Sequence, residues 1–268
     1  MKVLSYNVYG VRKLTKKIPS FKHRRKNLKR ILNTILTEEK IDVICMQEVN
    51  LFNEGFIIFI LDRLGYKVLK RFPMRAGLNV QFNLIAISKH GLKFKKLFSL
   101  PHSADKKYKS FWRQKPSYGM SEYRTTFFVE VEDETRSYII GNTHTDHISE
   151  EGRKKGIEKS LTYLDRHKAE VKLLTGDMNT SRESDLISNI LKNNPNYELV
   201  TKTTRDILSF HHYGLNKEKD LDFAFINKGI PSSYHIIAET SLINEGSDHR
   251  PVIIEIGDNN ENRNCSRP

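Results

Sequence analysis

The sequence has few cysteines, no long apolar run and no recognisable leader. Its two cysteines, Cys45 in an apolar run and Cys265 in a polar stretch, form no disulfide framework and match no Cys/His zinc spacing. No apolar run approaches the roughly 18 residues that a membrane-spanning helix needs. Met1 is followed directly by a strand-like segment rather than by a signal-peptide core. We therefore predict a cytoplasmic protein without a transmembrane segment.

Internal repeats, low-complexity linkers and breaks in composition are also missing from the 268 residues. Their absence argues against a solenoid and against two domains joined by a linker. The hydrophobic fraction of 38%, with 14 Phe and 11 Tyr, is sufficient for a sizeable core. We predict one domain over residues 1–257, a disordered polar tail over 258–268, and a monomer.

Acidic residues are outnumbered, because 45 Lys and Arg face 32 Asp and Glu and give a net charge of +13. Such an excess favours a polyanionic partner: nucleic acid, an anionic phospholipid surface or a phosphorylated small molecule. A lysine-rich surface that only keeps the protein soluble explains the same charge, and the totals do not separate these alternatives.

Periodicity predicts an α/β fold with mixed sheets. Residues 2–7 and 42–48 are expected to form parallel strands, because a helix with apolar positions from Leu28 to Leu36 separates them. Residues 101–121, with the only tryptophan, are predicted as a loop, and 201–220 as irregular. Further strands are expected at 66–71, 84–88, 93–97, 123–132, 136–142, 171–174, 221–226, 235–239 and 252–256, and further helices at 56–64, 150–167 and 183–192.

Polar residues recur where the apolar strands stop. The apolar run 171–174, for example, gives way to a glycine, an acid and an amide. Each such residue alone is an ordinary loop residue. Eight of them, all Asn, Asp, Glu or His, are harder to explain in that way. They are Asn7, Glu48, His144, Asp177, Asn179, Asp222, Asp248 and His249.

The order and context of these residues resemble the endonuclease/exonuclease/phosphatase superfamily, whose fold is that of DNase I. The resemblance implies a four-layer α/β sandwich, with two mixed β-sheets flanked by helices and the site at one rim. It spans residues 2–256. The motifs are Ser-Tyr-Asn-Val (5–8), Met-Gln-Glu-Val (46–49), Gly-Asn-Thr-His (141–144), Gly-Asp-Met-Asn (176–179), Leu-Asp-Phe-Ala-Phe (221–225) and Ser-Asp-His-Arg-Pro-Val (247–252).

The resemblance implies a metal-dependent hydrolase of phosphoric esters. Glu48 would be the principal ligand of Mg²⁺, for which Mn²⁺ could substitute, with Asn7 close by and Asp248 contributing. Hard oxygen ligands suit Mg²⁺, and the ion would neutralise the anionic ester during in-line attack of water.

The catalytic residues implied by the resemblance agree with this chemistry. Asp177 and Asn179 would orient the attacking water and a phosphate oxygen. His249 and Asp222 would form a His-Asp dyad, in which His249 is either the base or an electrostatic clamp. His144 would stabilise the phosphoryl oxygen or assist the leaving group.

Four further residues are expected on the substrate side. Arg124 matches a phosphate-contacting arginine of the DNase I branch, and Asn83 resembles a substrate-side asparagine or acid. Asp146 and His147 are expected to contact the substrate, with a helix-capping turn before residue 150 as the alternative.

Members of different branches of the superfamily act on different substrates. The motifs of this sequence do not fit any single one of the branches compared below. His144 stands where the abasic-site endonucleases have tyrosine, and 219–223 lacks the signature of the inositol-polyphosphate phosphatases. Ser181, rather than Arg182, occupies the position of the arginine of sphingomyelinases and tyrosyl-DNA phosphodiesterases. The stretch 142–147, followed by 149–153, is instead similar to that of bacterial members without an assigned substrate.

The basic helix face at 24–30 and the loop around Trp112 favour a nuclease acting on a phosphodiester in nucleic acid. A phospholipid or phosphoinositide phosphoesterase, sphingomyelinase-like or a phosphatase, is the alternative enzyme. A non-catalytic relic that binds nucleic acid or lipid is the alternative of another class.

Overall fold

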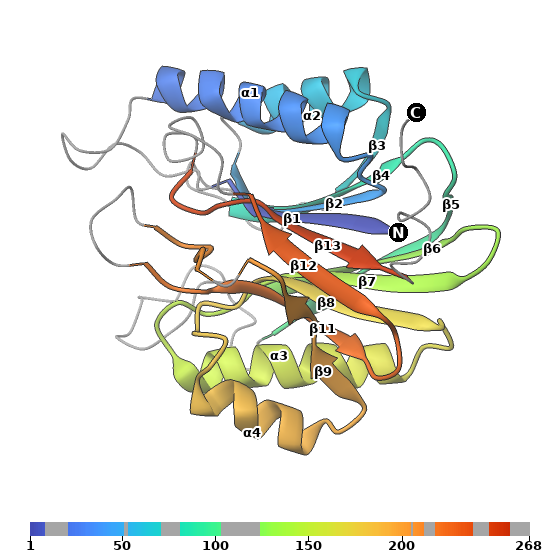
Figure 1. Ribbon diagram of the computed structural model, residues 1–268, viewed down its shortest axis with the longest axis vertical. Helices are drawn as coiled ribbons and strands as arrows, with labels where there is room; N and C mark the ends of the chain where they lie inside the picture. The colour runs from blue at the N-terminus through green and yellow to red at the C-terminus, as the bar shows by residue number, and fades with distance from the viewer. Residues whose placement is uncertain are drawn as a thin grey trace, which may run out of the picture.

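The computed structural model describes residues 1–8, 21–50, 53–70, 81–102, 124–204, 206–211, 218–237 and 247–257. Figure 1 shows the elements arranged in layers, with two packed sheets in the middle and helices covering the outer face of each sheet. The helices are α1 (Phe21–Glu38), α2 (Glu54–Arg63), α3 (Glu150–Asp165) and α4 (Asp185–Asn193). None of the helices in these ranges is long and apolar enough to cross a membrane. The predicted four-layer sandwich is confirmed.

Both sheets mix parallel and antiparallel strands. The first has the order β10 (Thr201–Lys202), β12 (Ser232–Ile236), β13 (Val252–Ile256), β1 (Lys2–Asn7), β2 (Val43–Asn50), β4 (Gln81–Ser88), β3 (Tyr66–Lys70). The second has the order β5 (Lys93–Pro101), β6 (Thr125–Glu132), β7 (Ser137–His144), β8 (Val171–Asp177), β11 (Asp222–Asn227), β9 (Tyr197–Leu199). β1 and β2 are parallel, as predicted, and so are β7 and β8.

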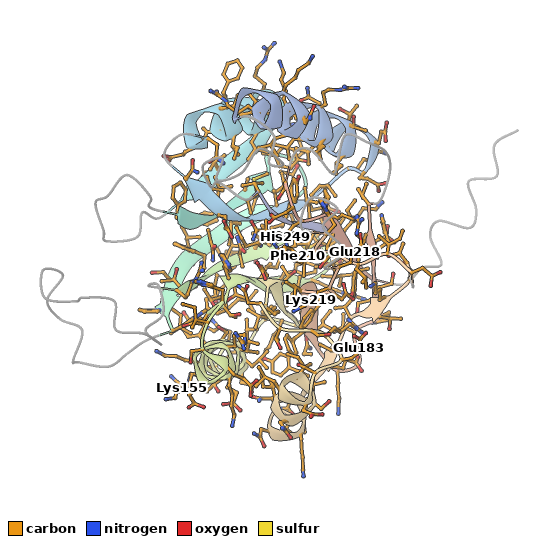
Figure 2. All side chains as sticks on the ribbon, turned by 90° about the vertical axis from the view of Figure 1, so that its left-hand side faces the viewer. Lys155, Glu183, Phe210, Glu218, Lys219 and His249 are labelled. Carbon is orange, nitrogen blue, oxygen red and sulfur yellow. The ribbon has the colours of Figure 1, made fainter. Side chains whose placement is uncertain are left out.

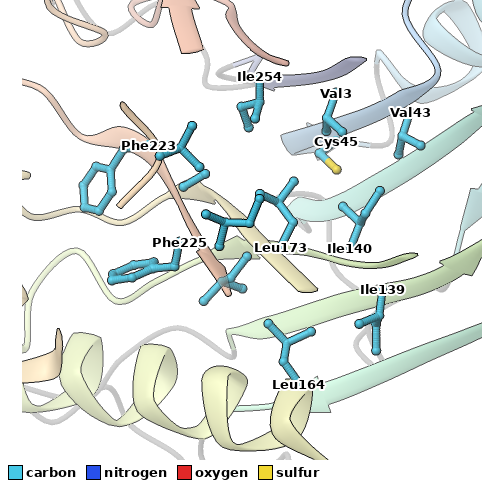
Figure 3. Packing of buried hydrophobic residues seen from close by; sticks show 14 of the residues in the cluster. Val3, Val43, Cys45, Ile139, Ile140, Leu164, Leu173, Phe223, Phe225 and Ile254 are labelled. Carbon is cyan, nitrogen blue, oxygen red and sulfur yellow. The ribbon is translucent and has the colours of Figure 1, made fainter. Parts of the chain in front are cut away.

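Apolar side chains fill the space between the two sheets. Figure 3 shows Val3 and Cys45 of the first sheet facing Ile140 and Leu173 of the second, while Leu164 covers the outer face of the second sheet from α3. All five are fully buried. Each buried aliphatic side chain contributes about 1.5–3 kcal/mol, so this interface fixes the two sheets relative to each other.

The space between the sheets becomes polar toward one end. Gln47 Nε2 donates to Asn142 Oδ1 (2.8 Å) and to Ser5 Oγ (3.2 Å). Asn142 Nδ2 in turn donates to the carbonyl oxygens of Met46 and Leu84, both at 2.9 Å. Buried amides are tolerated because they are hydrogen-bonded, and here they tie β7 of one sheet to β2 and β4 of the other. This polar bridge forms the floor beneath the residues described next.

The structure differs from the prediction mainly near the end of the chain. β9 and β10 were not predicted, and β10 lies in a segment expected to be irregular. The strand expected at 235–239 is β12, Ser232–Ile236, which lies between β10 and β13. Short strands of two or three residues are set by their neighbours in the sheet, so periodicity does not reveal them.

Candidate active site

The candidate active site lies where the carboxyl ends of parallel strands from both sheets meet. Asn7 ends β1 beside Glu48 of β2, and His144 ends β7 opposite Asp177, the last residue of β8. Figure 2 views the molecule from this end, and the labelled His249 lies near the middle, between the two helical layers. Asn7 and Glu48 therefore share one rim, as predicted, and the second sheet adds its own polar residues there.

Asn7 is at the centre of this rim. Its Nδ2 donates to Asp177 Oδ2 (2.9 Å) and Glu48 Oε1 (3.2 Å), and lies 3.5 Å from His249 Nε2. The backbone of Asn7 is held as well, because Ser247 Oγ donates to its carbonyl oxygen at 2.7 Å. One fully buried amide thus contacts three other motifs, which lie up to 242 positions away along the chain.

A β-bulge turns Glu48 into the site. The register between β2 and β4 shifts between Met46 and Val49, and Glu48 has a φ of 57°. Residues other than glycine adopt this left-handed region at a cost, which typically persists only at functional positions. Burial, and then the charge of the Asp248 carboxylate, raise the pKa of Glu48 to about 7, although the hydrogen bond from Asn7 acts in the opposite direction.

The rim fits a divalent cation. The carboxylates of Glu48 and Asp177 offer oxygen atoms that lie within 4.8 Å of each other, beside the imidazole of His144. Asp248, also buried, is close enough to raise the pKa of Glu48. Several carboxylates in a buried space repel one another, and a cation relieves that repulsion. Oxygen donors predominate, which suits a hard cation such as Mg²⁺.

His249 is paired with an acid. Its Nδ1 donates to Asp222 Oδ2 at 2.7 Å, which leaves Nε2 facing the rim. Ser209 Oγ accepts the backbone N–H of Asp222 (2.8 Å), and the ring of Phe210 lies 5.0 Å from that of His249. Burial alone would lower the pKa of His249, but the charges of Asp222 and Asp177 outweigh it and hold this pKa well above its usual value.

His144 is paired with a cation instead. Arg124 Nη1 donates to His144 Nδ1 at 2.7 Å, so the ring hydrogen must be on Nε2. That Nε2 lies 3.5 Å from Asp177 Oδ2 and 3.8 Å from Glu48 Oε1. Burial, and then the charge of Arg124, lower the pKa of His144 well below its usual value. His144 is therefore a neutral donor toward the two carboxylates.

Asp177 is fixed by the turn that follows β8. Gly176 has a φ of 140°, and a Cβ there would lie 1.9 Å from the carbonyl oxygen of Thr143, so only glycine fits. Asn179, with a φ of 49°, donates its backbone N–H to Asp177 Oδ1 at 2.9 Å. Its Nδ2 donates to the carbonyl oxygen of Thr145 at 3.0 Å. The Asp177/Asn179 pair thus lies at the rim, with the backbone N–H of Asn179 orienting the carboxylate of Asp177.

Asn83 lies in β4 and is used between the sheets. Its Nδ2 donates to the carbonyl oxygens of Thr125 (3.0 Å) and Asn142 (3.3 Å) of the second sheet. These contacts add to the polar bridge beneath the site. Both hydrogen bonds of this nitrogen hold the two sheets together. Contact of Asn83 with a substrate stays a prediction.

Asp146 and His147 differ in their surroundings. Asp146 Oδ1 accepts the backbone N–H of Ile148 (2.8 Å) and Ser149 (3.0 Å), and the residue is 2% exposed. This turn leads into α3, whose cap is Ser149, and contact of Asp146 with a substrate stays a prediction. His147 is exposed, and its Nδ1 lies 3.5 Å from Arg124 Nη2. Of the pair, His147 is the one that faces solvent.

Sequence reasoning missed four supporting residues. Gln47 and Asn142 could have been found, because both are polar residues in apolar strands on the side that faces the other sheet. Ser209 and Phe210 carried no signal, since they belong to a segment without periodicity and acquire their role only from the contact with β11 and His249.

Three predictions lie outside the described residues. These concern the Trp112 loop beyond residue 102, the side chain of Arg24, and the tail at 258–268.

Comparisons with known proteins agree with the geometry. Residues 4–249 match the sequence profile described as the endonuclease/exonuclease/phosphatase family. A search of the curated proteins found no match.

Similar solved structures cover nearly the whole chain. The endonuclease/exonuclease/phosphatase from Bacteroides vulgatus has a TM-score of 0.77 at 17% identity, covering 95% of this chain and 98% of that one. A mannosyl-6-phosphatase from Bacteroides thetaiotaomicron has a TM-score of 0.72 at 15% identity, covering 96% and 100%. TDP2 of D. rerio, complexed with single-strand DNA product, has a TM-score of 0.71 at 14% identity, covering 96% and 99%. At such identities the likeness establishes the fold alone.

Proposed function

The chain belongs to the endonuclease/exonuclease/phosphatase family, and from this premise we propose that it is a Mg²⁺-dependent phosphoesterase that hydrolyses phosphodiester bonds in nucleic acid. Members of this family are hydrolases that act on phosphoester bonds. One observation carries the proposal: the Nδ2 of Asn7 lies within 3.5 Å of Glu48, Asp177 and His249, each from a different motif.

The metal would be held by Glu48, with Asn7 and Asp248 beside it and Asp177 facing it across the rim. The crowding of buried carboxylates and the raised pKa of Glu48 support a cation here, with Mn²⁺ as a substitute for Mg²⁺. When bound, the ion supplies positive charge that neutralises the phosphate and favours attack by water.

The side chains divide the remaining work. Asp177, oriented by the backbone N–H of Asn179, accepts a proton from the attacking water. The oxygen of that water bonds to phosphorus while the bond between phosphorus and the leaving oxygen breaks. His249, held charged by Asp222, donates from Nε2 to a phosphoryl oxygen, so it acts as a clamp rather than as the base. His144 adds a neutral donor from its own Nε2.

Nucleic acid is the preferred substrate because of charge. The net charge of +13 suits a polyanion, whose backbone phosphates bind Lys and Arg independently of sequence. The similar fold of TDP2, solved with a single-strand DNA product, is compatible with such a substrate at this rim.

A second candidate is a phosphoesterase that acts on a smaller anionic substrate. The similar fold of a mannosyl-6-phosphatase favours a phosphomonoester, and the same positive charge suits a phospholipid or phosphoinositide head group. A non-catalytic relic is disfavoured, because Glu48, Asp177 and His249 all retain groups that can do the chemistry.

A substrate panel tests the proposal. Purified protein would be incubated with plasmid DNA, single-stranded DNA, RNA, phosphatidylinositol phosphates, sphingomyelin and sugar phosphates, in Mg²⁺ and in EDTA. We expect cleavage of nucleic acid in Mg²⁺, none in EDTA, and none by Glu48→Gln. If nucleic acid stays intact while another ester is hydrolysed, the proposed substrate is wrong. If no substrate is hydrolysed with any metal, the proposed enzymatic activity is wrong.

A further inference from the structure

Helix α1 carries its charge unevenly. Residues 22–30 contain six Lys and Arg, and the first acid of the helix is Glu38. Lys26, Lys29 and Arg30 are exposed and, at spacings of three and four, lie on one face. We call these three residues the α1 ridge. Farther along the same face, Asn33 and Thr37 carry no charge, so the cations are confined to the first half of the helix.

The charged half of α1 is the half nearest the candidate active site. β1 runs toward the rim and ends at Asn7, and α1 returns in the opposite direction to reach β2, which is parallel to β1. Figure 1 shows α1 starting on the side where β1 ends. At about 1.5 Å per residue, Arg30 lies roughly 14 Å from the first residue of the helix. The α1 ridge therefore begins close to the rim and leads away from it.

The charge order opposes the helix dipole. The amino end of a helix favours acids and disfavours cations, yet α1 has no acid in its first turn. Helix α3 also starts near the rim and follows the rule, with a Ser149 cap followed by Glu150 and Glu151. Departures from local rules are expected where function requires them, and the departure is confined to α1.

Nearby acids do not neutralise the α1 ridge. Within the described ranges, no acid forms an ion pair with any of its three residues. Asp62 of α2 pairs instead with Lys89 (2.8 Å), and Glu39 pairs with Lys2 (2.9 Å). The positive charge of this surface is therefore available to an outside anion.

Two aromatic rings of α2 contact cations outside the α1 ridge, one of them on α1 itself. The guanidinium of Arg25 lies 4.4 Å from the ring centre of Phe56, and that of Arg63 lies 5.5 Å from the ring centre of Phe59. Phe59 is 56% exposed, although α2 is otherwise an apolar helix packed on the sheet. Proteins that bind single-stranded nucleic acid combine cations, which contact the backbone phosphates, with exposed aromatic rings, on which the bases stack.

We propose that the α1 ridge, with Phe59, is an exosite that binds the nucleic-acid backbone on one side of the scissile phosphodiester. This inference rests on the proposed nuclease function. The strand leaves the rim past the amino end of α1, and its phosphates bind Lys26, Lys29 and Arg30 in turn. The exosite raises affinity for a long strand and does not touch the reacting phosphate.

The test compares two triple variants with equal changes in charge. The ridge variant is Lys26→Gln/Lys29→Gln/Arg30→Gln. The control is Lys154→Gln/Lys155→Gln/Lys192→Gln, which removes three cations from the opposite helical layer. Cleavage of a single strand of about 30 nucleotides is measured beside hydrolysis of bis(p-nitrophenyl) phosphate, which is too short to reach the exosite.

For the ridge variant we expect KM for the oligonucleotide to rise about tenfold or more, with kcat unchanged and the small ester unaffected. The slope of log affinity against log salt should fall by about 2, since each lost contact removes roughly 0.7. Phe59→Ala should raise KM by a smaller factor. The control triple should stay within about twofold of wild type. Equal KM values for the ridge and control triples would overturn the exosite.

A binding assay separates failure of the exosite from failure of the proposed function. Glu48→Gln protein, with and without the ridge substitutions, is titrated into a fluorescent oligonucleotide and, separately, into phosphatidylcholine vesicles with and without phosphatidylserine. Ridge-dependent binding of the oligonucleotide supports the exosite even if wild-type protein cleaves no nucleic acid. Ridge-dependent binding of phosphatidylserine vesicles without oligonucleotide binding would assign the surface to a membrane and reject the proposal.

Discussion

The two histidines of the rim, His144 and His249, are alike in burial and opposite in charge. His249 places its Nδ1 against the carboxylate of Asp222, whereas His144 receives a hydrogen bond at Nδ1 from the guanidinium of Arg124. The pKa of His249 is therefore held well above its usual value and that of His144 well below it. The residue type alone does not assign the role, because the group behind the ring decides it.

The difference extends to the acids of the site. The charge of His249 lowers the pKa of Glu48, which burial otherwise raises, so His249 offsets part of the carboxylate repulsion. Neutral His144 does not share in this effect. A metal at Glu48 and a charged His249 thus act in the same direction, and both favour an anionic substrate.

The largest effect should come from removing His249. We expect His249→Ala to lower kcat by about 10⁴-fold and His144→Ala by about 10²-fold, because only His249 supplies a full positive charge to the phosphoryl group. Steady-state hydrolysis of bis(p-nitrophenyl) phosphate measures both, with circular dichroism to verify folding. Equal losses for the two variants would contradict the difference in charge.

Asp222→Asn should convert His249 toward the state of His144. We expect kcat to fall by about 10²- to 10³-fold. The pKa of His249 is higher in the folded protein than in the unfolded chain. The stability that protonated His249 contributes is therefore fully present below the pKa of the unfolded chain, and it is lost as pH rises through the raised pKa of the folded protein. The alkaline limb of the pH–rate profile should therefore move to lower pH in the variant. An unmoved limb would show that Asp222 does not hold the charge on His249.

Glu48 should make the metal-free protein less stable as pH rises. The folded protein holds a proton on Glu48 up to about pH 7 and the unfolded chain only to about 4.5, so stability falls between these values, by up to about 3 kcal/mol. Urea unfolding in EDTA measures this loss as the difference between wild type and Glu48→Gln. At pH 7, Mg²⁺ should restore stability in wild type alone. Equal responses of both proteins to Mg²⁺ would place the metal elsewhere.

The smallest effect should come from Arg124. Arg124→Met leaves Nδ1 of His144 without its donor, so the ring is free to carry its hydrogen on either nitrogen. We expect kcat to fall by about tenfold, and ¹⁵N NMR of His144 to show a mixture of tautomers. Arg124→Lys, which keeps one donor, should recover most of both. His147→Ala removes the contact between His147 Nδ1 and Arg124 Nη2 but leaves the donor to His144 in place, so it should not change the tautomer of His144 and serves as the control for the NMR measurement.

Periodicity predicted the helices and strands, the resemblance to the family implied the four layers, and the motifs at strand ends identified the residues at the rim. Residues 2–7 and 42–48 gave a correct parallel pair, and 123–132 with 136–142 a correct antiparallel one. The roles of the histidines could not be predicted in the same way. Arg124 lies 20 positions from His144, and Asp222 lies 27 from His249. Only the folded chain determines which group stands at each Nδ1.

Of the residues that support the site, some could be recognised in the sequence and others could not. Gln47 and Asn142 were visible as polar residues in apolar strands, although their mutual bond depends on how the two sheets face each other. Ser209 and Phe210 lie in a segment without hydrophobic periodicity. Their positions are set by isolated β-bridges from Phe210 to Lys219 and to His249, which the sequence does not reveal. The raised pKa of Glu48 also has no signal in sequence, because burial causes it.

The opposite charges of the two histidines can be observed by ¹⁵N NMR of their imidazole rings in the folded, metal-free protein. Assignments would come from His144→Gln and His249→Gln. At pH 7 we expect His249 to be an imidazolium with both nitrogens protonated, and His144 to be neutral with its hydrogen on Nε2. Two rings that titrate together near the usual histidine pKa would contradict this expectation.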